Sequence, residues 1–364
     1  MFDCDSLDIN SGFFPRALNV VAKLKKIPIR CIFELTPRCN LNCRMCYVHL
    51  SEEKIKKIGR ELTNDEWLKI AEQAKESGVL YLTLTGGEIF TRPGFRELYE
   101  KLSEMGFLVS LMTNGTMIDE SVIEWLRERP PYSMSLTIYG SSNEVYEAVC
   151  GVKSGFDRFD RALTLLKEID IPIEVKTVLI KSNEHDFPEM FRYIQSKGIR
   201  LQHTYGVVKS VRGAVSDAAV VRRRRYELSG TIANGSNTLK RYAEGHGPYH
   251  HHSYYLDDCG VYGNTATVTW NGHMIFCTFT SKPFVDLLGV SFSDAWAELM
   301  AAVSNIKKPK KCSNCKYEEY CLRCPGSIAA ETGSYEFVTE DYCMDAKYLY
   351  SVYNDDKIEI NAER

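Results

Sequence analysis

The first half of the chain alternates short, continuously apolar runs with stretches in which apolar residues recur every three or four positions. Such a stripe predicts an amphipathic helix, and the first clear one consists of Trp67, Ile70, Ala71 and Ala74. Thr63 precedes it and is followed three residues later by Glu66, the capping-box pattern that starts a helix. Gly78 follows the stripe and is a typical helix end.

The continuous apolar runs predict six buried strands: Arg30–Leu35, Val79–Leu84, Phe107–Met112, Met134–Ile138, Ile173–Ile180 and a run near Leu201. A second helical stripe lies between the second and third runs and consists of Phe95, Leu98, Tyr99 and Leu102, with Gly106 at its end. Strands that alternate with helices in this way favour an α/β fold in which a parallel sheet is covered by helices.

The pattern divides the chain into five segments. Residues 1–28 precede the alternating pattern, which spans residues 29–205. Residues 206–258 break the rhythm and are interpreted as a bridging region. A cysteine-rich module follows at 259–344, and residues 345–364 hold a predicted closing helix at Asp345–Tyr353 and a tail.

Composition describes an ordinary globular protein. Of the 364 residues, 44% are hydrophobic and 26% charged, and the net charge of −3 gives no indication of a nucleic-acid partner. The chain has no apolar stretch of about 18 residues, so the sequence predicts no membrane span. The acidic N-terminus lacks the order of a signal peptide, so we expect a cytoplasmic protein.

The cysteines are clustered rather than scattered. The chain has 13, and three of them form the run Cys39-Asn-Leu-Asn-Cys43-Arg-Met-Cys46 directly after the first strand. Three thiolates so close together can hold three corners of a [4Fe–4S] cluster and leave its fourth iron open. A zinc site is the alternative, but it needs a fourth ligand, for which His49 is the only nearby candidate.

Two further polar loops follow the next two predicted strands. Gly86-Gly87-Glu88 follows the second strand and Thr113-Asn114-Gly115 the third. Each could be an ordinary strand-to-helix turn. Ligands of barrel-like α/β domains, however, gather at the carboxyl ends of the strands, where the Cys39–Cys46 loop also lies.

The three-cysteine loop after an apolar strand resembles the signature of radical S-adenosylmethionine (SAM) enzymes. The resemblance implies a fold that is an open, partial (β/α)6 TIM-like barrel. It also implies that SAM binds the free iron of the cluster on Cys39, Cys43 and Cys46, which are then the catalytic residues. Reduction would cleave SAM to methionine and a 5′-deoxyadenosyl radical that abstracts a hydrogen from the substrate.

The same resemblance implies the SAM contacts. Gly86, Gly87 and Glu88 match the family's Gly-Gly-Glu motif, which holds the SAM amino group, although Ile89 stands where many relatives have Pro. Met45 and the backbone of Tyr47 would contact the adenine. Ser135, at the end of the fourth predicted strand, and nearby Asn114 would also contact SAM. Many relatives pair the SAM carboxylate with an Arg near the position of Cys150, and here Lys153 or Arg158 would take that role, or the contact is lost.

The C-terminal cysteines resemble the SPASM module of peptide-modifying radical SAM enzymes, which carries two auxiliary iron–sulfur clusters. In that pattern one cluster has the ligands Cys312, Cys315, Cys321 and Cys343, and the other has Cys259, Cys277 and Cys324. A pair of zinc ribbons is the alternative. The second cluster is one protein ligand short. Either Asp257, Asp258 or one of His250–His252 completes it, or its iron is open to a substrate thiolate.

These features predict a radical SAM/SPASM enzyme that modifies a peptide or protein side chain, in particular the maturation of a ribosomally made peptide through a thioether or another crosslink. The resemblance implies an external electron donor of the flavodoxin or ferredoxin type. A formylglycine-generating sulfatase maturase is the alternative enzyme, but relatives of that type have Asp after the cysteine where this chain has Thr278 after Cys277. A zinc-stabilised binding scaffold is the non-enzymatic alternative. Arg222–Arg225 could contact an acidic peptide, although such a run is more often a solvated helix face.

Overall fold

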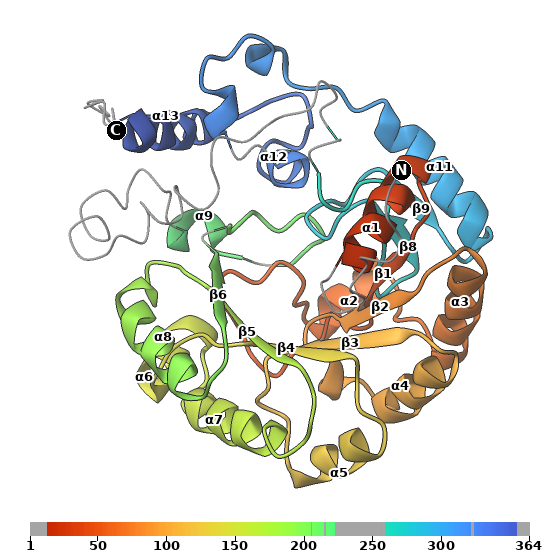
Figure 1. Ribbon diagram of the computed structural model, residues 1–364, viewed down its shortest axis with the longest axis vertical. Coiled ribbons are helices and arrows are strands. Elements are labelled where there is room, and N and C mark those ends of the chain that lie inside the picture. The colour runs from red at the N-terminus through yellow and green to blue at the C-terminus, as the bar shows by residue number, and fades with distance from the viewer. Residues whose placement is uncertain are drawn as a thin grey trace.

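The computed structural model describes residues 13–204, 206–214, 216–222, 256, 259–321 and 324–354. Its centre is one curved sheet, around which helices are arranged on the outer side (Figure 1). His250–His252 of the bridging region lie outside the described residues, as do Asp257 and Asp258.

The sheet has the strand order β6-β5-β4-β3-β2-β1-β7-β8-β9. Neighbouring strands from β6 to β7 are parallel, while β7–β8 and β8–β9 are antiparallel. The nine strands are β1 (Arg30–Glu34), β2 (Tyr81–Thr85), β3 (Leu108–Thr113), β4 (Ser133–Thr137), β5 (Ile173–Val178), β6 (Leu201–Thr204), β7 (Thr265–Val268), β8 (His273–Ile275) and β9 (Phe284–Asp286).

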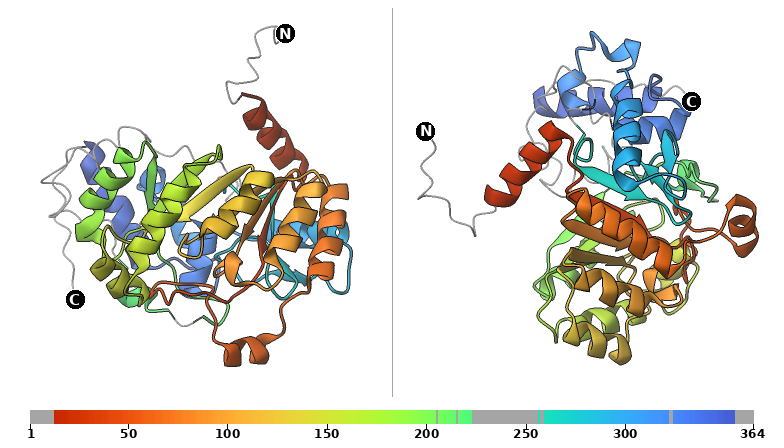
Figure 2. Two further views of the ribbon diagram at one scale, coloured as in Figure 1. Left: turned by 90° about the horizontal axis from the view of Figure 1, so that it is seen from below. Right: turned by 90° about the vertical axis from the view of Figure 1, so that its right-hand side faces the viewer.

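Helices connect successive parallel strands and cover the outside of the arc (Figure 1). The helices between β1 and β6 are α2 (Glu52–Ile58), α3 (Asn64–Glu76), α4 (Phe95–Glu104), α5 (Glu120–Glu128), α6 (Asn143–Cys150), α7 (Gly155–Leu166) and α8 (Phe187–Ser196). Those outside this range are α1 (Phe13–Lys25), α9 (Ala218–Val221), α11 (Phe292–Ser304), α12 (Pro325–Thr332) and α13 (Glu340–Asn354). Helix α1 projects from the body of the molecule (Figure 2).

The predicted α/β architecture is confirmed: the six expected strands form a parallel sheet that does not close into a full barrel. The bounds of the first five differ from the predicted ones by at most two residues, and β6, expected near Leu201, spans Leu201–Thr204. The capping box of Thr63 and Glu66 is present at the start of α3. The closing helix α13 begins at Glu340 rather than Asp345, so it includes Cys343.

The core forms where the inner face of α3 meets the sheet. Trp67 of α3 is fully buried, and its ring lies 4.6 Å from that of Phe33 on β1. Burying aromatic rings of this size removes much apolar surface from water. The stripe predicted from the sequence, Trp67, Ile70, Ala71 and Ala74, is buried throughout.

The cysteine-rich module is joined to the barrel by main-chain pairing. Strand β7, which follows Cys259, runs parallel to β1, with Arg30 opposite Thr265 and Phe33 opposite Val268. The sheet of the barrel therefore continues into the C-terminal part of the chain, which the sequence pattern did not predict. Within the described residues, no helix is both long and apolar enough to cross a bilayer.

Candidate active site and cysteine centres

A cavity of about 410 Å3 lies where the carboxyl ends of the parallel strands meet the loop that follows β1. Most of the residues predicted to bind SAM or its cluster line it: Cys39, Cys43, Met45, Cys46, Tyr47, Gly86, Gly87, Asn114 and Ser135. Ser135 lies in the middle of β4 rather than at its end. The tertiary structure thus collects four separate chain segments around one space large enough for a small organic molecule.

The cysteine loop supplies its own hydrogen-bond donors to sulfur. The backbone N–H of Leu41 donates to Cys39 Sγ at 3.4 Å, and that of His49 to Cys46 Sγ at 3.2 Å. The side-chain amide of Asn114 lies 3.8 Å from Cys39 Sγ. Hydrogen bonds to cysteine sulfur favour the thiolate and tune an iron–sulfur cluster. His49, the alternative zinc ligand, contributes its backbone to this loop and does not line the cavity.

Burial makes most of these thiols weak acids in the absence of a metal. It raises the pKa of Cys39 to about 12 and that of Cys46 to about 11. Hydrogen bonds from the side chains of Cys150 and Tyr139 lower the pKa of Cys43. Metal ligation requires thiolates, so loading of this site would release protons from Cys39 and Cys46.

The C-terminal end of α6 anchors the cysteine loop. The backbone N–H of Asn42 donates to the carbonyl of Cys150 at 2.9 Å, and that of Arg44 to the carbonyl of Val149 at 3.1 Å. The last carbonyls of a helix lack partners within the helix, and here the loop supplies partners for two of them. This docking holds Cys39, Cys43 and Cys46 against the rim of the sheet.

Gly86 and Gly87 permit a close approach between two backbones. A Cβ atom on Gly86 would lie 2.4 Å from the carbonyl oxygen of Thr36, and one on Gly87 would lie 2.1 Å from that of Arg38. The N–H of Gly87 donates to the Thr36 carbonyl at 2.7 Å. Since Thr36 and Arg38 directly precede the cysteine loop, the glycines fix the height of that loop above β2.

Glu88 is fully buried and does not line the cavity. Its carboxylate accepts hydrogen bonds from the Thr113 hydroxyl and the Asn114 N–H, both at 2.8 Å, and from the Phe90 N–H at 3.2 Å. Burial raises the pKa of Glu88 to about 7. The carboxylate therefore holds the loop after β3 in place. Its direct contact with the SAM amino group stays a prediction.

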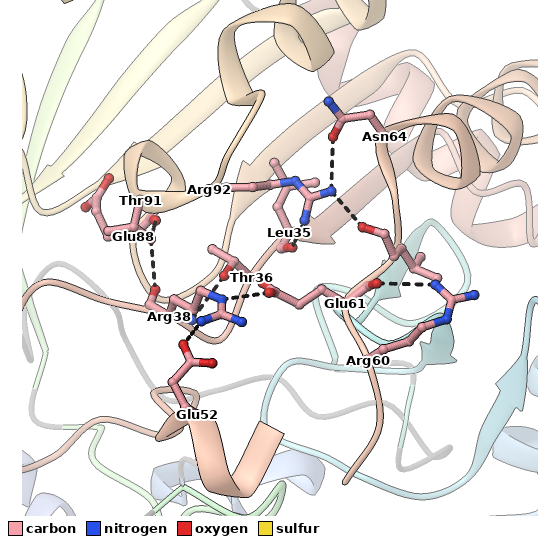
Figure 3. A network of polar contacts seen from close by, with 11 residues as sticks. Leu35, Thr36, Arg38, Glu52, Arg60, Glu61, Asn64, Glu88, Thr91 and Arg92 are labelled. Carbon is pink, nitrogen blue, oxygen red and sulfur yellow. Dashed lines mark hydrogen bonds and ion pairs between the residues drawn. The ribbon is translucent and has the colours of Figure 1, made fainter. Parts of the chain in front are cut away.

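Two arginines stabilise the segment between β1 and the cysteine loop (Figure 3). Arg38 forms ion pairs with Glu52 and, at 2.7 Å, with Glu61. The buried guanidinium of Arg92 donates to the carbonyls of Leu35 and Leu62 at 3.0 and 2.7 Å, and to the Asn64 side chain at 3.0 Å. Arg92 thereby ties the end of β1 to the start of α3.

Four C-terminal cysteines lie around a separate small cavity of about 50 Å3. Its lining includes Cys312, Cys315, Cys321 and Cys343, the set that the SPASM pattern assigns to one auxiliary cluster. Cys343 comes from α13, while the other three come from the loop region between α11 and α12. The four thiols thus line one space, although they are not grouped closely enough in the described part of the chain to surround one metal ion.

Cys259, Cys277 and Cys324 form a second C-terminal group. Burial raises the pKa of Cys277 to about 12, and the charges of nearby Cys324 and Cys259 raise it as well. Burial and the charge of Cys324 raise the pKa of Cys259. The proposed fourth ligands, Asp257, Asp258 and His250–His252, lie outside the described residues. No three Cys, His, Asp or Glu side chains of the described part of the chain are grouped as they would be around one metal ion.

The described part of the bridging region links the barrel to the C-terminal module. Arg222, 14% exposed, pairs with Glu331 of α12 at 2.5 Å and with Asp341 of α13 at 3.5 Å. Arg222 is therefore not part of a solvated helix face, because its charge is paired with these carboxylates. Arg223–Arg225 lie outside the described residues.

Several residues of the main cavity carry no signal in the sequence pattern that predicted the site. Lys176 of β5, Val207 and Val208 of the bridging region, and Thr278 and Phe279 after Cys277 all line it. Glu174 and Lys176 alternate with apolar residues along β5, a period-two pattern that marks them as neighbours on one face. Lys153 and Arg158, considered for the SAM carboxylate, are exposed and do not line the cavity.

Comparisons with known proteins agree with this geometry. Residues 33–194 match the model of the Radical SAM superfamily. Over 336 residues the chain is 26% identical to an AdoMet-dependent heme synthase of Methanosarcina barkeri. This match covers 86% of the chain and 95% of the synthase. It is 28% identical to a PqqA peptide cyclase of Granulibacter bethesdensis over 58% of this chain and 57% of the cyclase.

Among solved structures, SuiB of Streptococcus suis bound to S-adenosylmethionine has the same fold, with a TM-score of 0.66 and 16% identity over 92% of this chain and 83% of SuiB. The three-cysteine loop and most of the residues that line the cavity lie within the matched segment. Residues 33–194 therefore form a radical SAM domain.

Proposed function

We propose that the protein is a radical SAM enzyme that binds SAM in the 410 Å3 cavity and modifies a peptide substrate. The observation that carries the proposal is the shared lining of that cavity by Cys39, Cys43 and Cys46 and by the loops after β2, β3 and β4. A [4Fe–4S] cluster on the three cysteines, when bound, supplies the electron that cleaves SAM reductively.

The chain's own residues bind and enclose the reactants. Met45 and Tyr47 offer an apolar and aromatic surface for an adenine, while Asn114 and Ser135 offer hydrogen-bonding groups in the same wall. Apolar surface is added to the cavity wall by Val207 and Val208 of the bridging region and by Phe279 of the C-terminal module. An apolar enclosure of this kind excludes water, which protects a reactive intermediate from side reactions.

The central test removes the three cysteines of the loop. In the triple variant Cys39→Ala, Cys43→Ala and Cys46→Ala, formation of 5′-deoxyadenosine from SAM should be abolished, while iron bound at the C-terminal cysteines remains. Undiminished SAM cleavage in that variant would contradict the proposed function. Cys31→Ala is the control, because this cysteine is buried in β1 and does not line the cavity.

Two auxiliary clusters are part of the proposal. The cavity between Cys312, Cys315, Cys321 and Cys343 supports one, and the mutual proximity of Cys259, Cys277 and Cys324 supports the other. We also propose an external donor of the flavodoxin or ferredoxin type, since the reaction consumes an electron. A colourless protein that carries stoichiometric zinc after anaerobic purification would instead favour the zinc-stabilised scaffold.

A peptide substrate is supported by the names of the relatives. The cyclase of Granulibacter bethesdensis is named for the peptide PqqA, and SuiB has also been solved with its precursor peptide SuiA. Within peptide maturation, we favour a thioether or another crosslink. The absence of an Asp after Cys277, where Thr278 stands, disfavours the formylglycine-generating alternative.

A second candidate is a SAM-dependent step of heme synthesis. The match to the heme synthase of Methanosarcina barkeri extends over 95% of that protein, whereas the match to the peptide cyclase covers 57% of the cyclase. Mass spectrometry separates the candidates. Reduced enzyme and SAM are incubated in parallel with a peptide encoded beside the enzyme and with porphyrin precursors of heme, and the substrate that loses hydrogen or changes mass identifies the reaction.

A further inference from the structure

The wall of the main cavity carries one formal positive charge. Among the described residues that line it, Lys176 is the only Lys, Arg, Asp or Glu. The carboxylates of Glu34 on β1 and of Glu88 after β2 are fully buried and do not line the cavity. A ligand that presents a negative group would therefore meet its complement at Lys176.

The strand geometry directs Lys176 into this space. Lys176 and Val178 are two positions apart on β5, so their side chains leave the same face, and both line the cavity. Lys176 is in register with Thr137 on β4, and Val178 with Thr204 on β6. These two threonines line the cavity as well, so Lys176 lies among the residues of its wall.

Among the contacts that the structure shows, the ammonium group of Lys176 has a partner on one side. Lys176 Nζ lies 2.5 Å from Glu174 Oε1, and the other oxygen of Glu174 accepts a hydrogen bond from Gln202 Nε2 at 3.0 Å. An ammonium has three N–H donors. One of them satisfies Glu174, so the remaining donors are available to a ligand, and the side chain is 35% exposed.

We propose that Lys176 is the carboxylate-binding residue of this cavity, with Glu174 and Gln202 as the residues that position its ammonium group. The inference rests on the proposed function, because SAM carries a carboxylate on its methionyl portion. A substrate carboxylate is the other source of the same chemistry. A hydrogen bond to a charged group contributes more than one between neutral groups, so loss of the ammonium should weaken carboxylate binding about ten- to a hundredfold.

The test compares Lys176→Met with a matched control, Lys101→Met. Lys101 of α4 also forms an ion pair with a glutamate, Glu97, at 2.9 Å, and it does not line the cavity. Binding of SAM and of decarboxylated SAM to cluster-loaded protein is measured anaerobically by titration calorimetry. Circular dichroism verifies that each variant is folded, and Lys176→Arg tests whether a cation alone restores binding.

If the carboxylate is that of SAM, Lys176→Met weakens SAM binding about ten- to a hundredfold but leaves decarboxylated SAM within about twofold. If it belongs to the substrate, SAM binds equally well to both proteins, and hexaglutamate binds SAM-loaded wild type but not Lys176→Met. Equal binding of all three probes to wild type and variant overturns the inference, as does an equal loss for SAM and decarboxylated SAM. Failure of wild type to bind SAM would instead overturn the proposed function.

Discussion

Arg212 and Glu34 form an ion pair, with 2.6 Å between Arg212 Nη2 and Glu34 Oε1, at the junction of the barrel and the C-terminal module. Glu34 of β1 is fully buried, and Arg212 is 12% exposed. The other terminal nitrogen of Arg212 donates to the carbonyls of Thr278 and Thr280, at 2.5 and 2.9 Å. The guanidinium also lies 5.5 Å from the ring centre of Tyr47. One side chain thus connects β1, the residue after Cys46 and the residues after Cys277.

Replacement of Arg212 by Met should destabilise the fold by about 3–5 kcal/mol, because it leaves the carboxylate of Glu34 buried without its cation. Denaturant unfolding followed by circular dichroism measures this change. Arg96→Met is the matched control: Arg96 pairs with Glu100 at 2.7 Å on the exposed face of α4, so its loss should cost far less stability than the loss of Arg212. The double variant Glu34→Gln with Arg212→Met should recover part of the loss, and a double variant no more stable than Arg212→Met would contradict an electrostatic origin.

Substitution of Gly87 by Ala should displace the cysteine loop. The added Cβ would lie 2.1 Å from the carbonyl oxygen of Arg38, and this backbone atom cannot move without the residue that follows it, Cys39. We expect loss of the iron bound by the loop, measured by iron analysis and by the SAM-dependent change in the EPR spectrum of the reduced protein. Gly289→Ala is the control, because nothing lies within 4 Å of a Cβ at that position. Retention of the full iron content in Gly87→Ala would show that the loop tolerates the shift.

Glu88 should make stability depend on pH near neutrality. Burial raises its pKa from 4.5 to about 7, so between these values the folded state binds more protons than the unfolded state. The free energy of unfolding must then fall as pH rises from about 4.5 through 7. Gln resembles the neutral carboxyl group and does not titrate. Wild type should therefore lose stability relative to Glu88→Gln between pH 5.5 and 8 in denaturant unfolding, and a difference that is constant over this range would mean that Glu88 does not titrate there.

Removal of two cysteines from the small C-terminal cavity should remove one cluster and spare the others. The variant Cys315→Ala with Cys343→Ala breaks the set that lines that cavity. We expect about four fewer iron atoms per chain with SAM cleavage at the barrel cysteines retained. Cys31→Ala, at a buried position in β1 outside the cavity, should leave the iron content unchanged. An unchanged iron content in the double variant would exclude this cavity as a cluster site.

The sequence determined the fold class and the location of the chemistry. Helical stripes such as that of Trp67 and strand runs such as Arg30–Leu35 depend on local periodicity, which is visible along the chain. The three-cysteine loop, Gly86-Gly87 and Asn114 could be placed together in advance, because the carboxyl ends of parallel strands face the same side. The capping box at the start of α3 was also predictable from the sequence, because it depends on residues only three positions apart.

Only the tertiary structure decided which distant side chains meet. Arg222 is typical of a solvated run in sequence, yet two carboxylates from α12 and α13 surround it. Glu88 matches a ligand-binding motif, yet its carboxylate bonds to the loop after β3. Strand β7 continues the barrel sheet beside β1 although more than 200 residues separate them in the chain. Pairing, burial and charge compensation between remote segments depend on the packing of the whole chain. They therefore cannot be predicted from the spacing of residues along the sequence.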